Sequence, residues 1–106
     1  DLDGWSLQLA PAAGAAWTVT ELSGVIAPGQ YFLVGGVAGA TGAALPTPDV
    51  SAGFTLDLAG GKVALCIGTE PASEAEPRGT VPVMDFVGYG SADAKEGTTA
   101  APALAP

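Results

Sequence analysis

Short stretches in which apolar and polar residues alternate, each bounded by Gly or Pro, recur along most of the 106-residue chain. A period of two is typical of strands that are half buried in a sheet. The clearest short examples are residues 5–9 and 17–20. The Ala-rich segments 12–16 and 38–44 are interrupted by Gly and lack the 3.6-residue spacing of an amphipathic helix. The pattern therefore predicts an all-β protein with no helix of ordinary length.

Residues 54–67 carry the strongest local signal, because apolar positions alternate on both sides of a Gly-Gly pair. If Gly60 and Gly61 form a two-residue hairpin loop, one face of the hairpin holds six apolar side chains: Phe54, Leu56, Leu58, Val63, Leu65 and Ile67. Thr55, Asp57, Ala64 and Cys66 then share the other face. A three-residue loop would mix the two groups, so we expect the Gly-Gly register.

Other segments predict the remaining elements of a β protein. Residues 27–30, Ala-Pro-Gly-Gln, place Pro and Gly where a type II turn requires them. The apolar residues 31–34 predict a central strand covered on both faces. The Glu- and Pro-containing residues 68–80 predict a mobile acidic loop, and residues 81–89 return to a strand pattern. Residues 98–106 are rich in Ala and Pro and predict a tail.

The length suits one compact domain, and 48% hydrophobic residues are ample for its core. The formal net charge is −8, with 11 acidic against 3 basic residues. No apolar run is long enough for a membrane span, and no signal-peptide pattern is present. Cys66 is the one cysteine and cannot form an intramolecular disulfide.

Each segment that resembles a catalytic motif lacks a residue that the motif requires. Because there is no His, Ser-His-Asp and Cys-His arrangements cannot be built. Ser51 lacks the first Gly of a nucleophile elbow, and residues 60–63 have Val where a phosphate-binding loop needs Ser or Thr. Residues 88–90, Gly-Tyr-Gly, lack a third Gly at the required spacing. All three segments are interpreted as turns, and no catalytic or cofactor-binding residue is predicted.

The composition also restricts metals and nucleic acids as ligands. Zinc and iron need His and Cys clusters, so carboxylate-bound calcium is the only metal that the composition permits. Residues 1–4, Asp-Leu-Asp-Gly, resemble the start of a calcium loop but lack the later ligands, and a turn is the preferred interpretation. Lys62, Arg78 and Lys95 are too few and too dispersed for binding a phosphate backbone. No metal site, cofactor or nucleic-acid partner is therefore predicted.

The aromatic residues lie within predicted strands, which favours core packing over a carbohydrate-binding platform. Five of the seven are weighed for such a platform: Trp5, Trp17, Tyr31, Phe32 and Phe54. Cys66 is interpreted as a small apolar residue that fills space in the core.

The order of these segments resembles the lamin tail domain, the immunoglobulin-like sandwich of nuclear lamins and of many secreted bacterial proteins. The resemblance covers roughly residues 1–97 and looks closest to the bacterial branch. It is carried by DLDGWSL at 1–7, Trp17, PGQYFLV at 28–34, Leu45-Pro46, Asp49-Val50, GGKVAL at 60–65, DFVGYG at 85–90, Ala92 and Glu96-Gly97.

The resemblance implies an immunoglobulin-like β-sandwich over residues 1–97, with 98–106 as a tail or linker. It implies a non-catalytic accessory or interaction module of a secreted or cell-surface bacterial protein. The alternative is the N-terminal appendage of a secreted nuclease of the endonuclease/exonuclease/phosphatase type. Counterparts of the family's first strands and closing strand are missing, so we expect an incomplete sandwich, from a fragment or a shortened copy. Its exposed strand edges would allow self-association.

Overall fold

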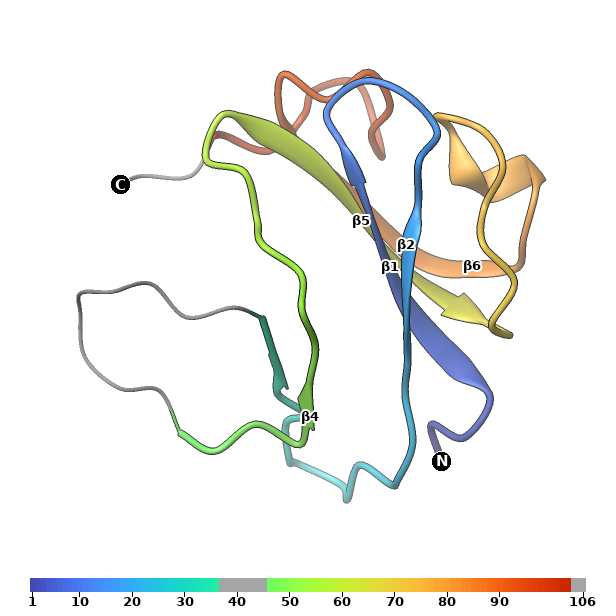
Figure 1. Ribbon diagram of the computed structural model, residues 1–106, viewed down its shortest axis with the longest axis vertical. Coiled ribbons are helices and arrows are strands. Elements are labelled where there is room, and N and C mark those ends of the chain that lie inside the picture. Colours follow the sequence, from blue (N-terminus) through green and yellow to red (C-terminus); the bar gives the residue numbers. More distant parts are fainter. Residues whose placement is uncertain (37–45, 104–106) are drawn as a thin grey trace.

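The computed structural model describes residues 1–36 and 46–103. Four strands form an antiparallel sheet in the order β2-β1-β5-β6, and two short strands form a separate parallel pair, β3-β4 (Figure 1). The strands are β1 (Trp5–Pro11), β2 (Thr18–Glu21), β3 (Val34–Gly35), β4 (Val50–Ser51), β5 (Gly60–Ile67) and β6 (Val83–Gly90). Apart from one 3-10 turn, η1 (Pro77–Gly79), the described residues contain no helix, so the all-β prediction is confirmed. None of the described residues forms a helix long and apolar enough to cross a membrane.

The pairing of β1 with β5 fixes which side chains share a face of the sheet. Leu9 lies opposite Val63 and Leu7 opposite Leu65, and directly opposed residues project to the same side. We call this side the apolar face; it includes Trp5, Leu7, Leu9, Val63, Leu65 and Ile67 and, from β6, Val87, together with Asp85 and Tyr89. The other side, called the small-residue face, consists of Ser6, Gln8, Ala10, Lys62, Ala64, Cys66 and Phe86. The alternation predicted for both strands is confirmed.

The hydrophobic core lies on the small-residue face. The buried cluster joins residues of the sheet to residues of the loops around it: Ala10, Trp17, Ala64, Cys66, Ala72, Phe86 and Ala94. The rings of Trp17 and Phe86 pack with their centroids 6.4 Å apart. Cys66 is 1% exposed, as expected of a small residue that fills the core. On the apolar face Leu9 is buried, but Trp5 and Leu7 are only half buried.

The predicted hairpin at Gly60 and Gly61 is wrong. Both residues belong to β5, where Gly61 pairs with Pro11 on one side and Tyr89 on the other. Neither has a positive φ. A Cβ atom at Gly60 would lie 2.6 Å from the backbone nitrogen of Ser91, so glycine is required here by close packing rather than by a turn. The segment 54–58 lies outside the strands and runs past the apolar face instead.

The predicted central strand at residues 31–34 is also wrong. Only Val34 and Gly35 form a strand, and it has a single described partner, β4. Tyr31 is 97% exposed and therefore does not pack in the core. The preceding turn is confirmed, because Gly29 has φ 76° and the Gln30 N–H donates to the Ala27 carbonyl over 3.0 Å.

The loop predicted at 68–80 is present, and part of it packs on the core. It includes η1, and its Ala72 and Pro77 side chains are buried. The strand predicted at 81–89 is confirmed as β6. The following chain returns to this strand, where the Ala101 N–H donates to the Gly88 carbonyl over 2.9 Å. The helix-free prediction for 38–44 and the last residues of the tail lie outside the described residues.

Candidate functional site

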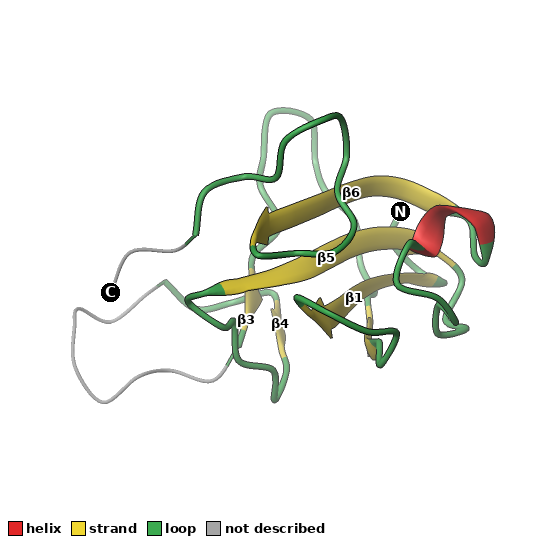
Figure 2. Ribbon diagram, turned by 90° about the horizontal axis from the view of Figure 1, so that it is seen from above, coloured by secondary structure: helices red, strands yellow, loops and turns green. Residues whose placement is uncertain are grey.

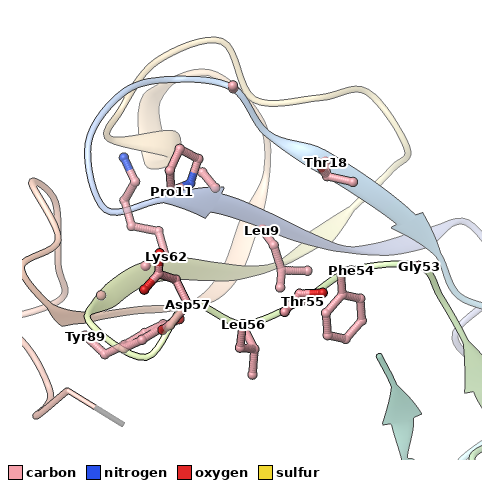
Figure 3. A pocket seen from close by; sticks show the side chains of 14 residues that line it. Leu9, Pro11, Thr18, Gly53, Phe54, Thr55, Leu56, Asp57, Lys62 and Tyr89 are labelled. Carbon is pink, nitrogen blue, oxygen red and sulfur yellow. The ribbon is translucent and has the colours of Figure 1, made fainter. Parts of the chain in front are cut away.

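A groove runs between the apolar face and the segment 53–58. One part of it, about 360 Å³ in volume, is lined by Leu7, Leu9 and Val63 of the sheet and by Val34, Phe54 and Leu56 of the covering segments. A second part, about 430 Å³, shares Leu9, Phe54 and Leu56 with the first and adds polar groups from Thr18, Asp57 and Tyr89. Figure 3 shows Leu9 pointing from β1 toward the segment that carries Leu56, whereas Lys62 points to the opposite side.

Large apolar side chains on this side of the sheet and in the covering segment remain partly exposed. Ile67 at the end of β5 is 43% exposed, and Val87 of β6 is 45% exposed. In the covering segment, Leu56 is 43% and Leu58 is 49% exposed. Single exposed apolar residues are ordinary, but a group of them beside an apolar groove is typical of a surface that binds a partner.

Two acidic side chains lie on the groove's side of the sheet, whereas Lys62, which also lines the second part, carries its ammonium group on the other side. Asp57 lines the groove, and Asp85 of β6 lies opposite Leu65, on the same side of the sheet. Among the described residues only two of the 11 acidic side chains, Glu76 and Asp93, form ion pairs. The remaining acids therefore favour a partner with positive charge.

The small-residue face holds a second feature, a buried lysine. The Lys62 side chain is 0% exposed, and its Nζ donates to the Gly14 carbonyl over 2.7 Å and to the Ala75 carbonyl over 3.1 Å. Its third partner is Oδ1 of Asp93, at 2.6 Å. An ammonium group has three donors, so all of them are satisfied. Nζ also lies 5.5 Å from the centroid of the Trp17 ring.

Asp93 completes a closed arrangement with the lysine. Its second oxygen, Oδ2, accepts the Gly14 N–H over 3.0 Å, so Gly14 contacts both charged side chains. The hydrogen bond from Lys62 and then that from Gly14 hold the pKa of the Asp93 carboxyl below its usual range. The Asp93 side chain is 37% exposed, so one edge of the pair faces solvent.

Two further side chains attach the acidic loop to the sheet. The Gln8 amide donates to the Glu70 carbonyl over 2.8 Å and accepts the Ala72 N–H over 2.9 Å. The Trp17 Nε1–H donates to the Glu74 carbonyl over 2.8 Å. Polar groups on the best-buried face are thus paired with backbone groups of the loop.

The segments weighed as motifs in the sequence have structural positions. Ser51 lies in β4, residues 60–63 in β5 and residues 88–90 in β6, so their interpretation as turns is wrong. Residues 1–4 do form a turn. Asp3 Oδ1 of this turn accepts a hydrogen bond from the N–H of Gly24, which lies after β2, over 3.0 Å. Within residues 1–36 and 46–103, no three His, Cys, Asp or Glu side chains are grouped as metal ligands.

The basic residues do not form one surface. Arg78 pairs with Glu76 and donates to the Lys95 carbonyl over 3.2 Å, whereas Lys62 is buried on β5. Sequence reasoning missed the Lys62–Asp93 pair, because the two residues lie far apart in the chain. The one available signal was the alternation, which places Lys62 on the same face as Ala64 and Cys66.

No known protein family, no curated protein and no solved structure matches the chain. The fold and the groove define the class: a nearly all-β protein whose four-stranded antiparallel sheet has one well-buried face and one partly covered apolar face.

Proposed function

We propose that this chain is a non-catalytic interaction module of a secreted or cell-surface bacterial protein, built as an immunoglobulin-like sandwich of the lamin tail type. The observation that carries the proposal is the groove on the apolar face, with partly exposed Leu56 on its wall and partly exposed Ile67 and Val87 on the same side of the sheet. A partner that covers these side chains would gain binding free energy of about 25 cal/mol for each Å² of apolar surface removed from water.

The position of β3 and β4 supports the sandwich. Val34 and Gly35 line the groove together with Leu7, Leu9 and Val63, so β3 lies over the apolar face of the main sheet. Figure 2 shows these two short strands running crosswise to β1 and β5. Strands β3 and β4 have only two residues each. They therefore leave much of the apolar face available to a partner.

The partner expected from the groove is an extended peptide with apolar side chains and basic residues. The apolar lining of the groove favours apolar side chains in the peptide. The acidic side chains of Asp57 and Asp85 favour basic residues. A displayed library of random peptides, selected on the immobilised chain, tests this. We expect enriched sequences that combine apolar and basic residues and bind in the micromolar range or better.

Two variants make the selection specific to the groove. Leu56→Glu places a charge on the groove wall and should abolish enrichment, whereas Val25→Glu, at a 72% exposed site outside the groove, should leave it unchanged. Failure to enrich any sequence, or equal enrichment on both variants, would refute the proposal.

The same proposal predicts no hydrolytic activity. The chain should show background rates with DNA, RNA and a generic phosphoester in the presence of Mg²⁺, Mn²⁺ or Ca²⁺. Turnover that persists through a second purification step would favour an enzyme instead.

A further inference from the structure

We propose that the side chains of Lys62 and Asp93 condense to an intramolecular amide bond that links β5 covalently to the loop after β6. The proposal rests on the placement of the two groups, independently of the groove. Nζ lies 2.6 Å from Oδ1, and further hydrogen bonds from the backbone hold both side chains in position. Groups held at such distances in a folded chain reach effective concentrations of about 10⁵ to 10⁸ M.

The reaction requires the neutral form of the pair, in which Nζ is an amine and Oδ1 carries a proton. The Lys62 side chain is fully buried and lies against the Trp17 ring, which itself packs on Phe86. Transfer of one proton across the Nζ–Oδ1 hydrogen bond converts the ion pair into an amine and a carboxylic acid. The amine is the nucleophile that the reaction needs.

Backbone groups orient both reactants. After proton transfer, the two remaining N–H bonds of Lys62 can still donate to the Gly14 and Ala75 carbonyls, which directs the nitrogen lone pair toward Asp93. The Gly14 N–H donates to Oδ2 over 3.0 Å. This donor stabilises the negative charge that develops on Oδ2 when nitrogen adds to Cγ.

The atoms balance without a cofactor or an oxidant. Of the three ammonium protons, the first passes to Oδ1, and nitrogen then forms a bond to Cγ. The second proton passes to the Oδ1 hydroxyl, the Cγ–Oδ1 bond breaks and water leaves. The third proton remains on the amide nitrogen. Because Asp93 is 37% exposed, the water has a route to solvent.

The reaction is expected to be slow. Lys62 and Gly14 hold the pKa of Asp93 below its usual range, so the ion pair is the resting form and the neutral pair is a minor one. The amide should therefore accumulate after folding and be absent from chains kept unfolded.

Mass spectrometry of the intact chain tests the proposal. The purified protein is incubated at neutral pH and sampled over several days under denaturing conditions. We expect a growing species that is lighter than the sequence by one water, and a digest that contains a branched peptide joining residues 62 and 93. A mass that stays at the sequence value throughout would overturn the proposal.

Variants separate this reaction from other losses of water. Lys62→Arg keeps a positive charge but cannot form the amide, and it should retain the sequence mass. Lys95→Arg is the matched control and should lose water as the unaltered chain does. An aspartyl succinimide also loses water, but it would persist in Lys62→Arg and give no branched peptide, and that result would refute the cross-link.

Discussion

The ring of Tyr89 on β6 lies across Gly61 on β5, so close that a Cβ atom at Gly61 would be 2.7 Å from the Tyr89 hydroxyl oxygen. The same hydroxyl donates to the Asp57 carbonyl over 2.8 Å. Tyr89 thus attaches the end of the covering segment to the sheet, and the missing side chain at Gly61 provides the space. The glycine that resembles a turn residue in the sequence is a packing residue in the fold.

We expect Gly61→Val to lower the free energy of unfolding by about 1–3 kcal/mol, since inserting atoms into a close-packed site costs that much. Thr55→Val, at an exposed position, should change it by less than about 0.5 kcal/mol. Denaturant unfolding followed by fluorescence measures both. If contact with Tyr89 is the cause, the cost of Gly61→Val should fall in a Tyr89→Ala background. An equal cost in both backgrounds would contradict the packing explanation.

The faces of the sheet could be predicted because the period of a strand is a local property. Leu7 and Leu9 share a side, and so do Val63 and Leu65, whatever covers them. Which side becomes the core is not local. Gln8 and Lys62 are buried because backbone groups of a distant loop satisfy them, and nothing in the spacing of residues 5–9 shows that loop.

The hairpin prediction failed for the same physical reason. A Gly-Gly pair is compatible with a tight turn and also with close approach of a neighbouring chain, and the sequence around Gly60 is the same in both cases. The choice depends on Tyr89 and Ser91, which follow it by more than 25 residues. The groove likewise could not be predicted, because its wall at Phe54 and Leu56 was assigned to a strand of that hairpin.

The buried amide of Gln8 should contribute measurably to stability. Gln8→Leu leaves the buried Ala72 N–H without its acceptor, and an unsatisfied buried group costs about 1–3 kcal/mol. Gln30→Leu is the control, since Gln30 is exposed and its change should stay within about 0.5 kcal/mol. Urea unfolding of the two variants gives the comparison. Equal midpoints would show that the loop at 70–72 does not depend on this side chain.

The thiol of Cys66 should be unreactive in the folded protein. Burial raises the pKa of the Cys66 thiol and keeps it from solvent, so little thiolate is available to a disulfide reagent near pH 8. Because folding raises the pKa of this thiol, its contribution to the free energy of unfolding is fully present below the ordinary pKa of a cysteine. That contribution is lost as the pH rises through the raised pKa. We expect slow labelling that accelerates sharply in denaturant. Equal rates with and without denaturant would place the thiol at the surface.

Salt should increase association of the chain with itself. The net charge of −8 keeps copies apart, and at about 0.15 M salt this repulsion is screened beyond about 8 Å. Contact between apolar side chains is not weakened by salt. Two copies of the chain should therefore associate more, through the apolar face and the edge strand β2, as the salt concentration rises. Size-exclusion chromatography with light scattering at low and high salt measures the effect. Leu56→Glu should stay monomeric in conditions where Val25→Glu and the unaltered chain associate, and association that Leu56→Glu does not reduce would place the contact elsewhere.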